Sequence, residues 1–137
     1  MKYTSDNDLP LVTDAMLQGA LTKTRPYTAA VLKAGPRFEP LGPDRSAEIG
    51  AIIWQHGKRN YALRLAGLLR IVCPVADGTE VSGISVFDAT AEDVDRILSR
   101  DPAVEAGVLR YEIHPTRTFP ESSLNVEETI GAAPPPS

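Results

Sequence analysis

Short apolar segments alternate with amphipathic ones through the middle of this chain, and proline or glycine separates most of them. Four segments have the length and the β-branched content of strands, namely residues 27–33, 69–75, 81–88 and 109–114. Ser46 is a candidate N-cap for a long helix that runs to about Gly67, and Thr90 begins a second helix. The resulting order, βαββαβ, is that of the ferredoxin-like split-βαβ arrangement. We therefore predict an α+β domain with an antiparallel sheet and both helices on one face.

Proline positions set the expected ends of these elements. Gly35 and Pro36 stop the first strand, and Pro102 follows the second helix. Pro115 is expected to close the last strand, because proline cannot donate a backbone hydrogen bond to a sheet.

The pattern divides the chain into an arm, a domain and a tail. The arm, residues 1–25, is mostly polar, but after the candidate cap Thr13 it carries apolar residues at helical spacing: Met16, Leu17, Ala20 and Leu21. We expect this short helix to dock on the core or on a partner subunit. The domain covers residues 26–120. The tail, residues 121–137, ends in a proline-rich stretch that is expected to be disordered.

The charge balance argues against nucleic acid as a partner. The 137 residues fit one domain, and 14 Lys and Arg against 18 Asp and Glu give a formal net charge of −4. Nucleic-acid-binding domains are usually basic. The single Cys73 excludes an internal disulfide and fits a reducing compartment. Because no segment resembles a secretory signal or a membrane span, we expect a cytoplasmic protein without membrane contact.

The face of the predicted sheet that the helices leave open combines apolar and ionisable side chains. Strand alternation assigns to this second face Arg70, Val72, Val81, Ser85, Phe87, Arg110, Glu112 and His114. A solvated face needs no such apolar residues, and a closed core does not carry four ionisable groups. The mixture predicts a homodimer interface with a polar cleft, and the alternative is an ordinary half-exposed sheet.

Two residues are candidates for proton chemistry, and each also has a structural explanation. His56 lies on the apolar stripe of the long helix, where it could act as a general base or acid, or be a core histidine bonded to a backbone carbonyl. Asp101 precedes Pro102, where its carboxylate could orient a histidine or cap a helical turn over residues 102–106.

The remaining candidates belong to the sheet. Arg110 and His114 could bind a carboxylate or form interface salt bridges with Glu112. Ser85 and Cys73 complete the candidate substrate-binding set, although Cys73 is also typical of a buried structural thiol. A metal held by both histidines and a carboxylate has no supporting ligand spacing. No phosphate-binding loop or nucleotide motif occurs, so we expect no metal and no cofactor.

The stretch covering residues 27–124 resembles the YCII-related family. The resemblance is carried by YTAAVLKAGP (27–36), QHGKRNYALRLAGLL (55–69), GISVF (83–87), DPAVEAGVLRYEIHP (101–115) and FPESSLN (119–125). It implies a ferredoxin-like fold of the dimeric α+β barrel superfamily, with two sheets packed face to face in a dimer. It also implies that His56 and Asp101 form the active site. Where the family often has Gly-Pro after the second strand, this chain has Cys73 and Pro74.

Two functions of different classes follow. The first is a cofactor-independent enzyme of the lyase or isomerase type, a chemistry that the resemblance implies. In it His56 moves a proton on a small anionic or ring-shaped substrate, Asp101 orients His56, and Arg110 attracts the charge. The second is a non-catalytic dimeric module that binds a small molecule or acts as a scaffold through its N-terminal arm.

Overall fold

The computed structural model of the chain describes residues 2–119 and Leu124. Four antiparallel strands form one sheet in the order β2-β3-β1-β4, and the fold is α+β. The strands are β1 (Pro26–Ala34), β2 (Leu69–Pro74), β3 (Val81–Phe87) and β4 (Leu109–Arg117). The helices are α1 (Asp14–Leu21), α2 (Ala47–Leu65), α3 (Ala91–Ser99) and α4 (Pro102–Glu105), and a 3-10 turn spans Asp6–Asp8. The predicted βαββαβ order is confirmed, and the arrangement is compatible with a ferredoxin-like domain.

The predicted caps begin the helices. Ser46 Oγ accepts a hydrogen bond from the backbone N–H of Ile49 at 3.3 Å, and Thr90 Oγ1 accepts one from Asp93 at 3.1 Å. Each satisfies a backbone donor that a helix start otherwise leaves free. Gly67 ends α2 with a φ of 78°, a left-handed conformation that favours glycine. The chain therefore turns directly from α2 into β2.

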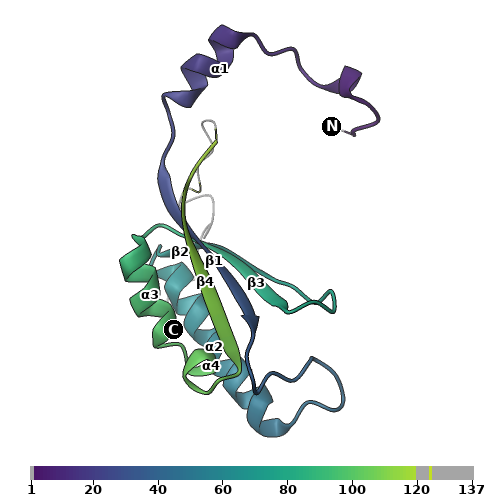
Figure 1. Cartoon of the computed structure of the whole chain (residues 1–137), viewed down its shortest axis with the longest axis vertical. Coiled ribbons are helices and arrows are strands. Elements are labelled where there is room, and N and C mark those ends of the chain that lie inside the picture. Colours follow the sequence, from purple (N-terminus) through teal and green to yellow (C-terminus); the bar gives the residue numbers. More distant parts are fainter. Residues whose placement is uncertain (1, 120–123, 125–137) are drawn as a thin grey trace, which may run out of the picture.

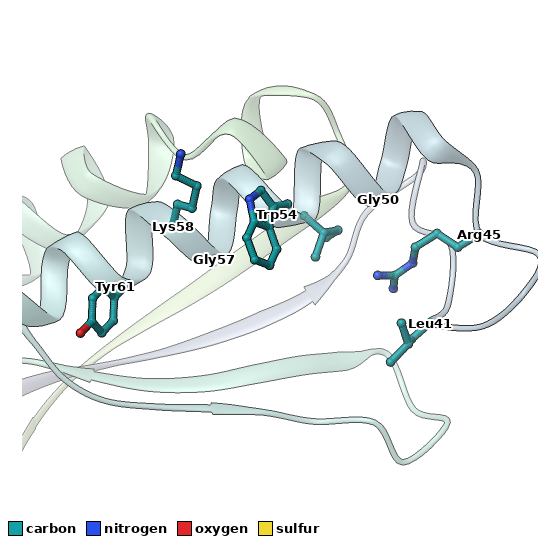
Figure 2. A pocket seen from close by; sticks show the side chains of 8 residues that line it. Leu41, Arg45, Gly50, Trp54, Gly57, Lys58 and Tyr61 are labelled. Carbon is teal, nitrogen blue, oxygen red and sulfur yellow. The ribbon is translucent and has the colours of Figure 1, made fainter.

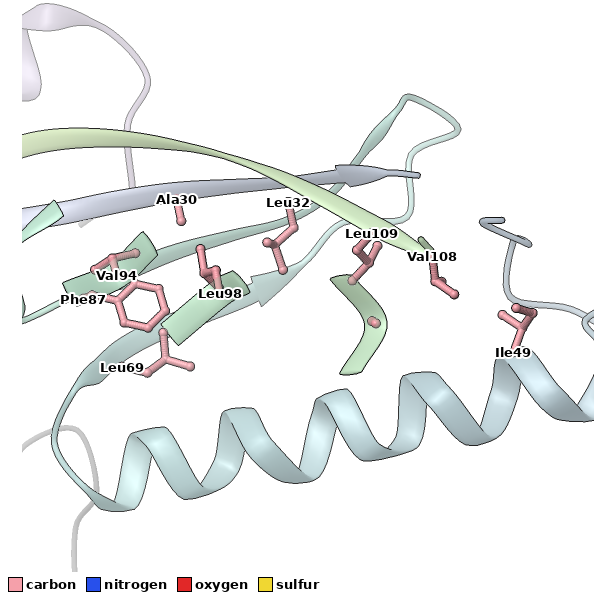
Figure 3. Packing of buried hydrophobic residues seen from close by; sticks show 10 residues of the cluster. Ala30, Leu32, Ile49, Leu69, Phe87, Val94, Leu98, Val108 and Leu109 are labelled. Atoms are coloured by element: carbon pink, nitrogen blue, oxygen red, sulfur yellow. The ribbon is translucent and has the colours of Figure 1, made fainter. Parts of the chain in front are cut away.

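Helices α2, α3 and α4 lie against one face of the sheet (Figure 1). The core fills the space between them and the strands, and Figure 3 shows Phe87 of β3 beside Val94 and Leu98 of α3. The fully buried side chains include Leu69, Phe87, Val94, Leu98 and Val108. Burying large apolar side chains is the main favourable contribution to folding, so this helix-covered face stabilises the domain. No helix among the described residues is long and apolar enough to cross a bilayer.

The assignment of β2 and β3 residues to the two sheet faces was partly wrong. Phe87 pairs with Thr28 and Ser85 with Ala30, and both lie on the helix-covered face. Val72, which pairs with Ser85, packs against the same core. The other face, here called the open face, instead carries Ala29, Val31, Ile71, Cys73, Ile84 and Val86 from these three strands. Alternation separates a strand into two sets of residues, but only the register with β1 decides which set meets the helices.

Arg70 does not join the open face either. It is 3% exposed, next to the irregularity in β2–β3 pairing between Leu69 and Ile71. Its Nη1 donates to the carbonyl oxygen of Gly67 at 3.4 Å. The guanidinium is thus directed to the end of α2 and not to a polar cleft.

Strand β4 continues past the proline that was expected to end it. Pro115 pairs with Thr28, and β4 runs on to Arg117, so the prediction of an end at Pro115 was wrong. Because β4 is an edge strand with β1 as its one neighbour, a residue without an N–H is tolerated there.

The N-terminal arm stands away from the domain (Figure 1). Helix α1 begins at the predicted cap Thr13, whose Oγ1 accepts from Met16 N at 3.2 Å, but none of its residues is buried. The expectation that it docks on the chain's own core was therefore wrong, while docking on a partner remains a prediction. The expected disorder at the end of the tail lies outside the described residues.

Candidate functional site

His56 and Asp101, 45 residues apart in the chain, are in direct contact. His56 Nδ1 lies 2.8 Å from Asp101 Oδ2. The imidazole side chain is 14% exposed and the carboxylate 1% exposed. Helix α2 supplies His56, and the turn between α3 and α4 supplies Asp101. The predicted pair is thus brought together at the place where these helices meet.

Asp101 also has the structural role that its sequence context indicates. Its Oδ1 accepts a hydrogen bond from the backbone N–H of Ala103 at 2.8 Å, which caps α4. Pro102 at the first helical position needs no donor. The two carboxylate oxygens therefore have different partners, and the cap fixes the direction from which Asp101 meets His56.

The second imidazole nitrogen has a partner as well. His56 Nε2 lies 3.2 Å from Asn60 Nδ2, one helical turn further along α2. An ionised carboxylate can only accept, so the proton of a neutral His56 resides on Nδ1, and Nε2 is an acceptor toward the Asn60 amide. The two contacts favour the tautomer in which Nε2 carries the lone pair, which accepts from Asn60.

The electrostatic environment keeps Asp101 ionised. Burial alone raises the pKa of a carboxyl, but the hydrogen bond and the charge of His56 act against it. The Ala103 N–H and the Arg59 guanidinium also lower the pKa of Asp101, which lies below its ordinary value. A negative Asp101 next to His56 stabilises the imidazolium that forms when Nε2 takes up a proton.

Arg59 is the cation nearest to this pair. Its Nη1 lies 3.9 Å from Asp101 Oδ2 and is buried without a hydrogen-bond partner among the described residues. Arg59 also lines a hollow of about 320 Å³ between α2 and α3, together with Leu68, Ile97, Arg96, Arg100 and Asp93. Asp93 is paired with Arg96, so the hollow has an excess of positive charge.

Arg110 and His114 are not part of this site. Arg110 Nη2 is paired with Glu80 Oε2 at 2.6 Å, and its Nε donates to the carbonyl oxygen of Ala34. His114 Nε2 lies 3.3 Å from Glu112, which also pairs with Lys33. These residues belong to the open face, whereas His56 packs on the helix side. The two histidines therefore cannot ligate one metal ion within a single chain.

Ser85 and Cys73 are separated from the pair in different ways. Ser85 is 3% exposed within β3, between Ala30 and Val72. Cys73 is exposed and lies opposite Ile84 on the open face. The interpretation of Cys73 as a buried structural thiol was wrong, because its position in β2 points it away from the helices.

Two contacts of the site were missed by sequence reasoning. The contact of His56 with Asn60 has a signal in the sequence, because side chains at positions i and i+4 of a helix lie side by side. Arg59 had no such signal, because its relation to Asp101 depends on how α2 packs against the α3–α4 turn.

Comparison of the chain with models of known protein families gives no match, and a search among curated proteins gives none.

Proposed function

We propose that the protein is a small cofactor-independent enzyme of the lyase or isomerase type, with His56 as its proton-transferring group. The observation that carries the proposal is the 2.8 Å contact of His56 with an ionised, fully buried Asp101. A fixed imidazole beside a buried carboxylate is suited to general base and acid catalysis near neutral pH. Asp101 is the residue that orients His56, and His56 is the one that meets substrate.

The proposed reaction begins with proton abstraction by His56 Nε2 from a carbon or hydroxyl of the substrate. The proton stays on Nε2, and Asp101 stabilises the resulting imidazolium. Return of the same proton to another substrate atom completes an isomerisation, and its transfer to a leaving group completes an elimination. Asn60 must release Nε2 to the substrate, or rotate its amide so that Oδ1 accepts from the protonated ring.

An anionic substrate fits the positive charge of the hollow that Arg59 lines beside the pair, although His56 is not part of the lining of that hollow. Arg59 and Arg100 line the hollow between α2 and α3, and neither is paired there with a carboxylate at a distance below 3.5 Å among the described residues. We propose that these arginines attract the substrate's charge, in place of Arg110, which is paired with Glu80. Arginine is well suited to this because its planar fork matches a carboxylate.

We also propose that the chain forms a cytoplasmic homodimer with a ferredoxin-like topology. The support for the dimer is the open face, where Ile71 and Ile84 are 40% and 48% exposed, together with the resemblance to the YCII-related family. A single exposed thiol, Cys73, is compatible with a reducing compartment.

The experiment is a thermal-shift screen of small carboxylates and ring compounds, followed by turnover assays on the compounds that bind. His56→Ala is expected to lower kcat at least about a hundredfold, a typical contribution of general acid–base catalysis. His114→Ala is the matched control and should leave kcat unchanged. Undiminished turnover in His56→Ala would sink the proposal. An Arg59→Ala variant is expected to raise KM more than it lowers kcat.

A second candidate is a non-catalytic module that binds a small anion. The observation in its favour is that Asn60 occupies His56 Nε2. The same screen separates the two functions: ligands that bind equally well to wild type and His56→Ala, and that are recovered unchanged, favour the binding module.

A further inference from the structure

The N-terminal arm presents apolar side chains that the described part of the chain leaves exposed. Leu11, Val12 and Met16 are 93%, 65% and 57% exposed. Within α1, Met16, Leu17 and Leu21 share one side of the helix, and Ala15 lies opposite. An amphipathic helix gains most of its stability by packing its apolar side. The arm therefore has an apolar surface that residues 2–119 and Leu124 do not cover.

A second uncovered apolar surface lies along α2, on the side away from the His56 pair. It is an open groove of about 740 Å³ whose lining includes Leu41, Arg45, Ile53, Trp54, Lys58 and Tyr61. Figure 2 shows Trp54 and Tyr61 projecting from α2, with Leu41 and Arg45 of the preceding loop at one end. Leu41, Trp54 and Tyr61 are 84%, 69% and 60% exposed. Exposed aromatic residues gathered in a groove mark a site for a helical partner.

The charges of the two surfaces are complementary. The arm carries Asp6, Asp8 and Asp14 and, before Lys23, the single cation Lys2. The groove has Arg45 and Lys58 in its lining and no acidic residue. The aspartates that precede and begin α1, together with its apolar side, thus match a basic groove with an apolar floor.

The arm is directed away from the groove of its own chain. Arg25 exchanges hydrogen bonds with Thr118 at 2.9 and 2.8 Å and pairs with Asp88 at 2.9 Å, so the base of the arm is fixed as an extension of β1. The groove residues Leu41 and Arg45 follow the opposite end of this nine-residue strand, about 30 Å away. From this fixed base the arm continues away from the domain (Figure 1), and none of the residues of α1 is buried, so α1 does not lie on the groove of its own chain.

We propose that the arm of one copy docks into the α2 groove of a second copy. The apolar side of α1 covers Trp54 and Tyr61, and its aspartates lie near Arg45 and Lys58. This contact is separate from the open face of the sheet and does not depend on the catalytic role of His56. It gives the arm a function in assembly, in which each copy both donates and accepts a helix.

The only tryptophan of the chain lies in the groove, so its fluorescence reports occupancy directly. In wild type at micromolar concentration, Trp54 emission is expected at shorter wavelength than after dilution to the monomer. The full-length variant Met16→Glu/Leu17→Glu should show the long-wavelength emission throughout and raise the dissociation constant about thirtyfold or more, the scale of a lost hot spot. Ala15→Glu is the matched control on the opposite side of α1 and should behave as wild type.

Crosslinking identifies which copy provides the arm. In a Cys73→Ser background, a Met16→Cys protein is mixed with a tagged Trp54→Cys protein under mild oxidation. A covalent hetero-pair is expected, with a much higher yield than from Ala15→Cys mixed with Trp54→Cys. A yield equal to that control overturns the proposal. Short-wavelength Trp54 emission that persists in the diluted monomer also overturns it, because it indicates an intramolecular contact. Short-wavelength emission from Met16→Glu/Leu17→Glu overturns it as well, because it indicates that something other than α1 occupies the groove.

Discussion

One histidine–carboxylate pair lies on each side of the sheet, and the two pairs differ in burial and in their further partners. On the helix-covered side, His56 and Asp101 are 2.8 Å apart with side chains 14% and 1% exposed. On the open face, His114 and Glu112 are 3.3 Å apart and 60% and 44% exposed. The buried pair is fixed by a helix cap and by Asn60, whereas the exposed pair shares Glu112 with Lys33.

The difference teaches that residue type alone does not define a site. Water screens the exposed pair and competes for its hydrogen bonds, so its geometry has little energetic consequence. Asp101 is buried, so removal of one of its partners leaves a polar group without compensation. The helix-covered side is therefore where a single substitution changes both stability and chemistry.

The largest expected change in the free energy of unfolding comes from comparing two residues of β3 that lie on opposite faces of the sheet. Phe87→Ala should lower the free energy of unfolding by about 3–5 kcal/mol, because it leaves a cavity in the core. Ile84→Ala, at a half-exposed position, should cost less than about 1 kcal/mol in the monomer. Urea unfolding measures both. A comparable loss for Ile84→Ala at low protein concentration would contradict the assignment of the faces.

The next effect contrasts the two carboxylates. Asp101→Ala should lower the free energy of unfolding by about 3 kcal/mol, because it breaks a buried pair and removes the cap of α4. Glu112→Ala should leave it nearly unchanged. Chemical denaturation with matched protein concentrations tests this, and equal losses would show that burial does not distinguish the pairs.

The smallest expected effect is the dependence of stability on pH and on salt concentration. Because the pKa of Asp101 is lowered in the folded protein, its contribution is present above the unfolded value, about 3.9, and is lost as the pH falls through the folded pKa. The stability advantage of wild type over Asp101→Asn should therefore shrink below about pH 4. The pKa of Glu112 is lowered as well, mainly by its hydrogen bond with Lys33. Salt near 1 M should remove the contribution of Glu112 to the pH dependence of stability, because this pair is exposed, and should leave the contribution of the buried Asp101 in place.

The elements of the fold could be predicted because their signals are local. Ser46, Thr90 and Asp101 cap helices through contacts within three residues, and Gly67 ends α2 through its own backbone. Which residues of β2 and β3 face the helices could not be predicted, because this depends on how the strands pair with β1 across the sheet. Alternation was correct in β4 and from Ile84 to Phe87 in β3, although the face that meets the helices was assigned wrongly in β3. In β2 alternation itself failed, because the irregularity between Leu69 and Ile71 leaves both Leu69 and Val72 against the core.

The candidate site was predictable to a smaller extent. The contact of His56 with Asp101 was suggested by the family resemblance, since no spacing rule joins residues 45 apart. The contact of His56 with Asn60 could be predicted from their i, i+4 spacing on one helix. The hollow beside Arg59 depends on the packing of α3 against α2, and nothing in the local sequence of either helix indicates it.

Both edge strands of the sheet contain a proline, Pro74 in β2 and Pro115 in β4. A strand added at either edge would meet a position that has no hydrogen to donate. Extension of the sheet into a longer ribbon is thereby discouraged, and so is the edge-to-edge pairing that begins many fibres. The contacts proposed above, through the open face of the sheet and through the arm, would join copies of the chain without lengthening the sheet.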